Sequence, residues 1–324
     1  MIYYLLKRLL FAFPVLFGIN LITFVLFFIV NSPDDMARMQ LGQKYVKPIA
    51  ITQWKVQHGY DLPLFYNEDK PVVEKVTQTL FFQKSLKLFT FNFGLSDSGR
   101  DIGFDIIHRM GPSLMIAVPV LLAGMVIEII IAMVLVFFRY TFVDVGGLIA
   151  CILIMSISSL FYIIGGQYLF SKLLRLVPIS GYDSGWQSFK FVILPIVVAI
   201  LSGLGSGVRW YRSLFIEEMS KGYVKTARSK GLRERAVFFN HVLRNVMLPV
   251  LTGVVVLIPS LFMGSLVLES FFGVPGLGSY MIDAIQQQDF AIVRTMVFLG
   301  SILYIGGLIL TDVSYTWADP RVRL

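Results

Sequence analysis

Residues 9–30 read LLFAFPVLFGINLITFVLFFIV, a run in which no side chain carries a charge. A helix of about 20 apolar residues spans a bilayer, because each residue rises about 1.5 Å through a hydrocarbon core about 30 Å thick. The run is longer than the apolar region of an ordinary signal peptide, and no small-x-small cleavage site follows it. We therefore interpret it as a retained helix that crosses a membrane, flanked by the basic residues Lys7 and Arg8.

Five further segments are long and apolar enough to cross a membrane, at about 113–138, 146–170, 190–208, 248–268 and 293–316. Of the 324 residues, 56% are hydrophobic and only 15% are charged, which is typical of membrane proteins rather than of soluble domains. The sequence therefore predicts an all-α integral membrane protein with about six transmembrane helices. The fourth segment ends in a stretch rich in Gly and Ser, residues that allow helices to approach closely.

The short loops indicate the orientation of these helices. Cytoplasmic loops carry an excess of Lys and Arg. This rule explains the net charge of +8, so the charge does not indicate a nucleic-acid-binding protein. Basic residues are concentrated at both termini, near Arg139 and in the loop before the fifth segment, whereas residues 269–290 contain no Lys or Arg. We expect a multi-pass membrane protein with both termini in the cytoplasm. The terminal basic residues are Lys7, Arg8, Arg321 and Arg323.

The same pattern divides the chain into three parts. Residues 1–30 are expected to form an N-terminal transmembrane helix, 31–112 an extracytoplasmic segment, and 113–324 a core of five helices with a cytoplasmic loop at 209–248. The outer segment contains many aromatic residues, so we expect short helices and irregular structure packed over the outer mouth. Prolines should break it into short pieces, namely Pro48, Pro63 and Pro71.

The cytoplasmic loop contains an amphipathic helical pattern. Apolar residues recur every four positions at Phe215, Met219, Tyr223 and Ala227, with charged residues on the other face. Gly231 is a natural helix stop, since glycine tolerates the left-handed conformation. A second helical stretch is expected from about 233 to 244. From the residues alone, this pattern fits an interfacial helix resting on lipid and a docking element for a partner protein equally well.

A family resemblance enters at this loop. The residues YVKTARSKGL at 223–232 and HVLRNVMLP at 241–249 resemble the coupling loop of ABC importer permeases, most closely the first (B-type) permease of the oligopeptide/dipeptide family. Further matching pieces follow in the family's order along nearly the whole chain: YLLKRLL at 4–10, FGINLITF at 17–24, GYDLPL at 59–64, FGLS at 93–96, VPGLG at 274–278 and ADPRVRL at 318–324. Two positions depart from the family: Gly222 replaces an acid or amide, and the usual Ser-Ile-Pro-Ser reads Ser156-Ile-Ser-Ser159, so no proline kink is carried over.

The resemblance implies a transporter assembled from several subunits in a bacterial cytoplasmic (inner) membrane. A second permease subunit, two cytoplasmic ATPases and an extracytoplasmic substrate-binding protein are the expected partners, together with membrane lipid and without nucleic acid. The cargo implied is a peptide, and specificity would rest largely with the binding protein. The residues expected to dock on an ATPase are Met219, Tyr223, Lys225, Thr226, Ala227, Arg228, Lys230 and Gly231.

Two further groups of residues are candidates for the transport path. Glu128 lies near the middle of the second span, where an acid is costly unless it faces protein or water, so it either lines the path or is a buried structural acid. The serines Ser156, Ser158 and Ser159 either line the path or bond to their own helix. The glycine-rich run after the fifth span is either an outer gate or a plain connector, and its residues are Val274, Pro275, Gly276, Leu277 and Gly278.

Other functional classes fit the sequence less well. A secondary transporter should show paired intramembrane charges or inverted repeats, and neither is evident. The sequence contains no GxxxxGK[ST] phosphate loop and no HExxH motif, so we expect neither ATP hydrolysis nor a catalytic metal or other cofactor on this chain. Cys151, the single cysteine, has no evident partner for nucleophilic catalysis. The same fold carrying nickel, a glycan fragment or an antimicrobial peptide remains an alternative.

Overall fold

Helices make up nearly all of the regular structure. The computed structural model describes residues 2–42, 46–68, 70–71, 74–183 and 185–318. Within this part of the chain there are α-helices, short 3₁₀ and π-helical segments and no strand. The terminal motif at 318–324, with Arg321 and Arg323, therefore lies outside the described residues beyond Ala318. The chain divides into two units, Met1–Arg109 with Tyr280–Gly306 (unit 1) and Met110–Ser279 with Gly307–Leu324 (unit 2).

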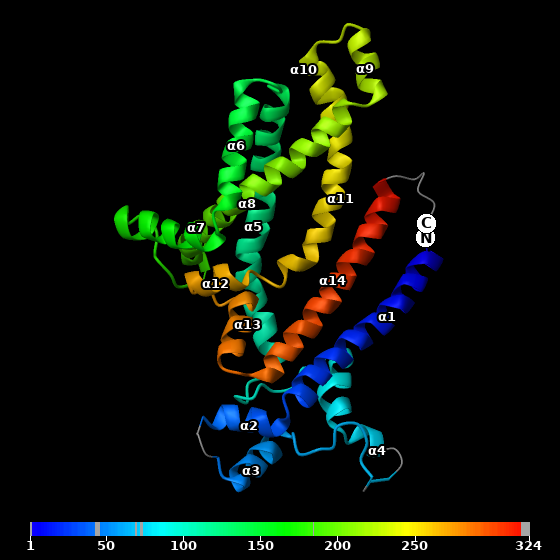
Figure 1. Cartoon of the computed structure of the whole chain (residues 1–324), viewed down its shortest axis with the longest axis vertical. Helices are drawn as coiled ribbons and strands as arrows, with labels where there is room; N and C mark the ends of the chain where they lie inside the picture. The colour runs from blue at the N-terminus through cyan, green and yellow to red at the C-terminus, as the bar shows by residue number, and fades with distance from the viewer. Residues whose placement is uncertain (1, 43–45, 69, 72–73, 184, 319–324) are drawn as a thin grey trace. The chain divides into compact units, whose positions relative to one another are not determined.

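Most of the helices lie entirely within one of the two units (labels in Figure 1). Unit 1 contains α1 (Ile2–Val25), η1 (Leu26–Val30), α2 (Pro33–Leu41), α3 (Pro48–His58), α4 (Glu74–Thr77), η2 (Phe81–Ser85) and η3 (Leu86–Thr90). Unit 2 contains α6 (Phe142–Ser156), α7 (Ser159–Gly166), η4 (Gln167–Leu173), η5 (Gly185–Gln187), α8 (Ser188–Met219), α9 (Gly222–Ser229), α10 (Glu234–Val237), η6 (Phe238–Leu243), α11 (Arg244–Leu261) and α12 (Leu266–Phe272). The boundaries between the units fall within α5 (Ile102–Phe137), α13 (Leu277–Gln286) and α14 (Phe290–Ala318).

Five helical segments in the described part are long and apolar enough to cross a membrane: Leu6–Val30, Ile102–Phe137, Ser188–Met219, Glu234–Leu261 and Phe290–Ser314. A sixth span is possible if the bent pair Phe142–Ser156 and Ser159–Leu173 counts as one. These correspond to the six segments expected from the sequence, and the fold is all-α as predicted. Several of them begin or end well beyond the apolar runs. The fifth expected segment ends at Leu261, before the expected end at 268, and Leu266 already begins the next helix, α12.

The helix α5 starts at Ile102, far before the predicted boundary at 113. The Asp101 carboxylate accepts a hydrogen bond from the backbone N–H of Phe104, at 2.8 Å, and so caps the first turn. The polar residues after it then continue the helix, although their charge ends the apolar run in the sequence. In the same way α8 continues past 208 to Met219, and the helical stretch that leads into α11 starts at Glu234.

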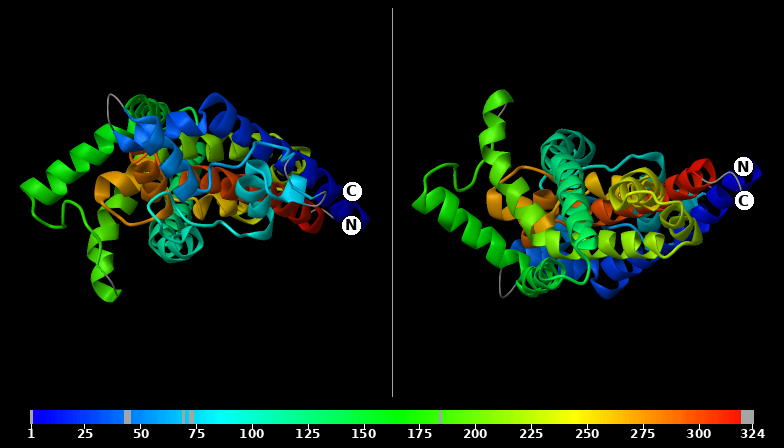
Figure 2. Two further views of the ribbon diagram at one scale, coloured as in Figure 1. Left: turned by 90° about the horizontal axis from the view of Figure 1, so that it is seen from below. Right: turned by 90° about the horizontal axis from the view of Figure 1, so that it is seen from above.

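The predicted third span is broken near its middle. Helices α6 and α7 meet at an angle of 87°, so α7 extends sideways from the end of α6 (Figures 1 and 2). Ile157 and Ser158 both have extended backbone conformations, which interrupts the helical hydrogen bonding. The Ile154 carbonyl, near the end of α6, accepts a hydrogen bond from the Tyr162 hydroxyl at 2.9 Å. This bond gives the carbonyl a partner in the last turn of the helix, where carbonyl groups lack partners within the helix itself. A sharp bend therefore forms here although no proline lies at the break.

Aromatic side chains hold the segment after α1 together in unit 1. Phe24 of α1 and Phe28 of η1 are buried with Trp54 of α3 and Tyr60. Phe24 also meets the ring of Phe81 edge-on, at 5.1 Å between centroids. Aromatic pairs in such geometries stabilise a core beyond the area they bury. The segment after α1 consists of short helices, as expected, and these helices pack on α1 through its aromatic face.

Candidate functional site: the loop around α9 and the latch at Glu269

The break between α8 and α9 shapes the candidate docking loop. The sequence predicts one helix through Met219 and Tyr223, but the backbone leaves the helical path at Ser220 and Lys221, just before Gly222. The Glu218 carboxylate closes this corner by accepting hydrogen bonds from the Lys221 Nζ and the Tyr223 hydroxyl, both at 2.6 Å. Burial and the bond to Glu218 raise the pKa of Tyr223 to about 12, so this hydroxyl stays a proton donor.

One face of α9 belongs to the core of unit 2. Val224 is fully buried and Ala227 is nearly so, and they pack in one cluster with Phe215, Phe238 and Val242. The cluster joins α9 to α8 and to η6, so α9 is fixed to the helices from which it projects. Ala227 is therefore covered by the chain itself and is not available on the outer surface. Met219 and Tyr223 are half-buried against the same cluster.

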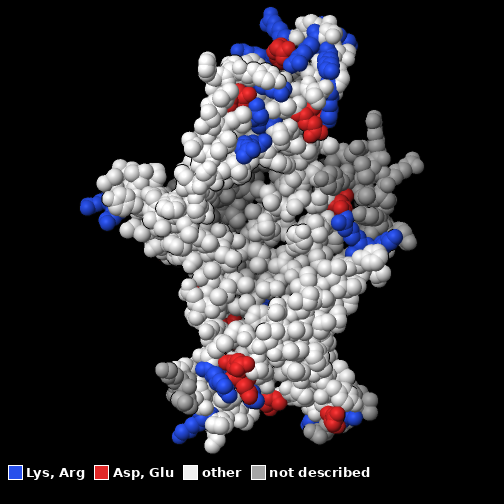
Figure 3. Space-filling view, in the orientation of Figure 1, with Lys and Arg blue, Asp and Glu red and all other residues white. Residues whose placement is uncertain are grey.

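The outer face of α9 is polar and basic. Lys and Arg side chains gather over α9 and α10 in the space-filling view (Figure 3). The Arg228 guanidinium bridges to the Glu234 carboxylate of α10, with Nε to Oε1 at 2.9 Å, and thus joins the two short helices. The remaining predicted docking residues are exposed, and they are Lys225, Thr226, Lys230 and Gly231.

The corner after α9 has the geometry that its glycine predicts. Gly231 has a φ of +78°, in the region that favours glycine, and its N–H donates to the Arg228 carbonyl at 2.9 Å. Leu232 directly follows it and is 43% exposed. An exposed leucine at a basic tip was not among the residues singled out from the sequence. The feature of the sequence that could have indicated it is the position of Leu232 as a single apolar residue between Gly231 and Arg233.

An ion pair ties the base of this region together. Arg212 of α8 donates from Nε to the Asp144 Oδ1 and from Nη2 to the Asp144 Oδ2 of α6, each at 2.9 Å. Asp144 is buried and also accepts a hydrogen bond from the Tyr140 N–H at 3.3 Å. A bidentate pair of this kind fixes the relative position of two helix ends.

We expect Asp144→Ala to destabilise the protein by about 3–5 kcal/mol, because it leaves the Arg212 guanidinium partly buried without its partner. Thermal unfolding of the purified protein in detergent measures this loss. Asp34→Ala is the matched control, since its pair with Lys55 is exposed and should contribute less than about 1 kcal/mol. Equal melting temperatures for the two variants would show that the Asp144–Arg212 pair contributes no more than a surface contact.

The glycine-rich run 273–278 is held by one buried acid, Glu269 of α12. This side chain is 1% exposed, and its Oε2 accepts hydrogen bonds from the backbone N–H groups of Gly278, at 2.7 Å, and Ser279, at 3.2 Å. Its Oε1 accepts a third, from the Ser265 N–H at 3.0 Å. Burial raises the pKa of the Glu269 carboxyl, while these N–H donors and Ser113 oppose the rise. One carboxyl group thus joins the start of α12 to the start of α13.

The space around this carboxyl group leaves no room for larger residues. A Cβ at Gly276 or at Gly264 would collide with the Glu269 carboxyl and with the Ser113 hydroxyl. The Ser113 hydroxyl of α5 accepts a hydrogen bond from the Leu277 N–H at 2.8 Å. Gly276 is therefore needed for the close approach of this run to the acid. We call the Glu269 carboxyl group, together with the groups that donate hydrogen bonds to it, the Glu269 latch. Of the other residues of the run, Val274 is buried in the core of unit 2 and Pro275 is exposed.

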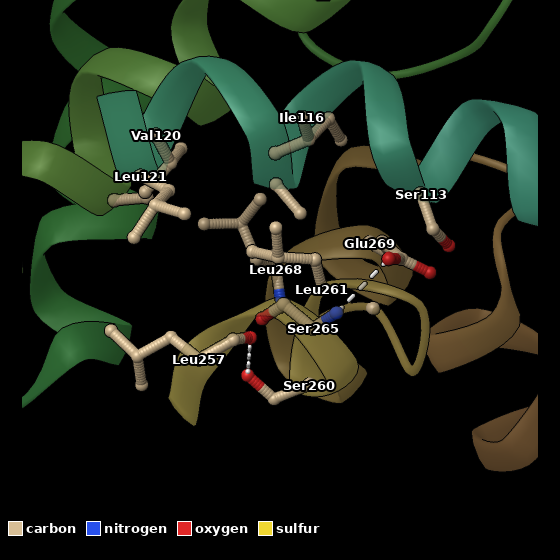
Figure 4. Close-up of a pocket in the computed structure, with 13 residues that line it drawn as sticks. Ser113, Ile116, Val120, Leu121, Leu257, Ser260, Leu261, Ser265, Leu268 and Glu269 are labelled. Carbon is tan, nitrogen blue, oxygen red and sulfur yellow. Dashed lines mark hydrogen bonds between the residues drawn. The ribbon is translucent and has the colours of Figure 1, made fainter. Parts of the chain in front are cut away.

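A cavity of about 300 Å³ lies beside the Glu269 latch in unit 2. Its walls come from α5, α8, α11 and α12 and are mostly apolar, with Ile116, Val120 and Leu121 of α5 facing Leu257 and Leu261 of α11 (Figure 4). Its polar groups are serine hydroxyls and the carboxyl of the latch: Ser113, Ser260, Ser265 and Glu269. An apolar cavity with a few convergent polar groups is the usual form of a small-molecule site.

The path residues expected from the sequence lie elsewhere in unit 2. Glu128 faces α8, where a Cβ at Gly207 would overlap its carboxyl group and where Gly203 is also near. The glycines of the fourth span therefore provide a groove that accommodates this acid. Ser156, Ser158 and Ser159 are exposed at the break between α6 and α7, and the Ser156 hydroxyl donates to the carbonyl of Ile152 in its own helix. Cys151 is buried in the core of unit 2.

Sequence reasoning missed Glu269, although a signal was present. It is a single acid within the apolar stretch LVLESFF, directly before a run of glycines. Apolar flanks predict burial, and a buried carboxylate needs several donors, which an adjacent glycine turn can supply from its backbone.

Comparison with known proteins assigns the chain to a family. Residues 114–324 match the family described as binding-protein-dependent transport system inner membrane component. The chain belongs to this family. Residues 1–87 match the accompanying N-terminal region of such membrane components. The chain is thus a multi-pass inner-membrane permease of an ABC transport system that includes other subunits.

Individual members of the transport permease family are similar over nearly their full length. A putative peptide transport system permease protein of Brucella abortus (strain 2308) is 32% identical, over 98% of this chain and 98% of the relative. A dipeptide transport system permease protein of Bacillus subtilis (strain 168) is 30% identical, over 82% of this chain and 83% of the relative. An oligopeptide transport system permease protein of the same strain is 25% identical, over 99% of both chains.

Proposed function

We propose that this permease carries peptides across the cytoplasmic membrane in an importer driven by separate ATPase subunits. The observation that supports this cargo is the 32% identity to a putative peptide permease over 98% of both chains. The partners proposed are a second permease, two cytoplasmic ATPases and an extracytoplasmic binding protein. Both termini and the loop around α9 would lie in the cytoplasm, and the chain itself would catalyse no reaction.

The proposed coupling is mechanical. The exposed residues of α9 and of its corner, Lys225, Thr226, Lys230 and Gly231, would contact an ATPase, and Leu232 adds an apolar anchor at the tip. Because the inner face of α9 is buried with α8 and η6, a displacement of α9 would be passed to these helices as a rigid-body movement. The Asp144–Arg212 pair would carry the movement on to α6.

The outer gate is proposed at the run 273–278. Its position depends on the Glu269 latch, which lies beside the cavity lined by α5, α8, α11 and α12. A shift of α12 relative to α13 would break the hydrogen bonds of the latch and change access to that cavity.

A reconstituted transporter tests this function. The chain is co-expressed with the proteins encoded beside it and purified through an affinity tag on this chain alone. We expect ATPase and second permease subunits to co-purify, and proteoliposomes with the binding protein to take up a labelled dipeptide only when ATP is supplied. Uptake by the chain alone, driven by an ion gradient without ATP, would instead identify a secondary transporter. Uptake of Ni²⁺ in place of the dipeptide would reject the peptide cargo.

A further inference from the structure

A second cavity, of about 290 Å³, lies in unit 1 and is lined by three cationic side chains. Lys84 and Lys87 come from the turn of helix formed by η2 and η3, and Arg294 comes from the first turns of α14. The lining residues also include two amide side chains, Gln83 and Asn92, and no Asp or Glu. None of the three cations forms an ion pair with a residue that the structure describes.

Nearby carboxylates are occupied by other donors. The Asp97 oxygens accept hydrogen bonds from the Tyr60 hydroxyl, at 3.0 Å, and from the Phe290 N–H, at 3.2 Å. The Asp289 oxygens accept from the N–H groups of Asp97, at 3.0 Å, and Ile292, at 3.2 Å. Three of the four oxygens thus fix the loop before α14 or the first turn of that helix, and the fourth, Asp97 Oδ1, holds the Tyr60 hydroxyl. The acids therefore support the wall of the cavity without filling it.

Two of the cations are held in place before any ligand arrives. Arg294 is only 5% exposed, and its Nε has no hydrogen-bond partner among the described residues. The Lys84 ammonium donates to the His58 carbonyl at 2.8 Å and lies 4.6 Å from the centre of the Tyr60 ring. Burial, followed by the like charge of Arg294, lowers the pKa of Lys84 to about 8. The Asp97 and Asp289 carboxylates act on Arg294 through their charge, but neither forms an ion pair with it among the described residues. The unused Nε–H of Arg294 can therefore donate a hydrogen bond to an anion in the cavity.

The walls indicate what kind of anion fits. Apolar side chains line the cavity beside the cations, among them Leu88, Phe93 and Leu95. Such a lining suits a carboxylate joined to a short apolar group better than a fully hydrated inorganic anion. The amides of Gln83 and Asn92 can bond a peptide backbone, since each carries both a donor and an acceptor.

We propose that this cavity binds the C-terminal carboxylate of a short peptide, between the cations Lys84, Lys87 and Arg294. The assignment of the carboxylate to a peptide rests on the proposed function. In the proposed orientation α14 begins on the extracytoplasmic side, so the cavity would be an entry subsite for cargo released from the binding protein. Recognition of the free carboxylate would favour peptides with an unmodified C-terminus.

Chemical footprinting of the complete transporter tests the proposal. The complex of permease and ATPase subunits in nanodiscs, without binding protein, is treated with formaldehyde and a borohydride reductant, and methylation of each lysine is followed by mass spectrometry. Trialanine at about ten times its dissociation constant should slow the methylation of Lys84 and Lys87 about tenfold, since only the unoccupied fraction reacts. Lys75, whose ammonium lies 5.4 Å from the Tyr66 ring outside the cavity, should react unchanged and serves as the internal control.

Two variants connect the protection to the cavity. Lys87→Met removes one cation whose side chain is half-buried, and we expect it to abolish protection of Lys84 by trialanine. Lys75→Met removes a lysine of the same unit outside the cavity and should leave the protection intact. Thermal unfolding of both variants should match the unmodified transporter, which confirms that Lys87→Met acts on binding rather than on folding.

Four results would overturn the proposal. Equal protection by the C-terminal amide of trialanine would show that the carboxylate is not recognised. Equal protection by inorganic phosphate would show a general anion site, and protection only on adding the binding protein would show a contact for a protein side chain. If the complete transporter imports trialanine with ATP while trialanine protects neither lysine, this inference fails and the proposed function stands. If no peptide is imported at all, the proposed function fails.

Discussion

Glu269→Ala is expected to remove most ATP-driven peptide uptake and to destabilise the permease by at least about 3 kcal/mol. The substitution leaves the buried backbone N–H groups of Gly278 and Ser279 without their acceptor, and it also removes the acceptor of the exposed Ser265 N–H. Each unsatisfied buried donor costs about 1–3 kcal/mol, and the missing carboxyl also leaves a void beside Gly276. The run 273–278 would lose its fixed position, and uptake in proteoliposomes should fall more than about tenfold, the factor that corresponds to 1.4 kcal/mol.

Glu269→Gln separates the hydrogen bonds from the shape of the side chain. The amide keeps one acceptor oxygen but places a donor where Oε1 or Oε2 receives an N–H group, so we expect a loss between those of the unmodified protein and Glu269→Ala. Glu68→Ala, at an exposed position in unit 1, controls for removal of one negative charge. Normal uptake and melting of Glu269→Ala would refute the role of the latch.

Length and hydropathy were sufficient to find the membrane segments. An uncharged run of about 20 residues has few alternatives to a spanning helix, because a backbone in lipid must satisfy its own hydrogen bonds. The ends of the helices were harder to predict, as α5 shows. Its start depends on the hydrogen bond that the Phe104 N–H donates to the Asp101 carboxylate. This bond starts the helix before the charged residues Asp105 and Arg109, which therefore lie inside it.

The bend between α6 and α7 shows a different limit. The family resemblance implies a proline there, and its absence argued against a kink by composition alone. In the structure two extended residues interrupt the helix, and the Tyr162 hydroxyl supports the break by bonding the Ile154 carbonyl. That contact joins positions eight residues apart across the break, so no helical periodicity could have indicated it.

The only features of the candidate site that were predictable are those that depend on residues adjacent in the sequence. The position of Gly231 after an amphipathic helix was sufficient to predict a left-handed residue, and its φ of +78° confirms it. Which face of α9 is free could not be predicted, because Val224 and Ala227 are covered by Phe215 and Phe238 from other helices. The Glu269 latch likewise depends on bringing α12, α13 and α5 together.

Gly231→Val is expected to uncouple ATP hydrolysis from peptide transport while the subunits still assemble. A β-branched residue at a φ of +78° costs on the order of 1–2 kcal/mol, and the corner after α9 would relax toward negative φ. This rotation would move Leu232 and the basic tip away from the ATPase surface proposed to receive them. We expect ATP hydrolysis by the purified complex to continue at a rate no longer increased by the binding protein and peptide, and uptake to fall at least about tenfold.

Gly99→Val provides the matched control for this uncoupling. Gly99 has a φ of +83° in a turn of unit 1, and a Cβ there meets nothing within 4 Å, as at Gly231. Both substitutions therefore impose the same kind of backbone strain in open space, and both variants should melt at similar temperatures. Only the strain next to α9 should separate hydrolysis from transport, because only that corner is proposed to lie against the ATPase. Loss of coupling in both variants would attribute the effect to general strain, and normal coupling in Gly231→Val would contradict docking at this loop.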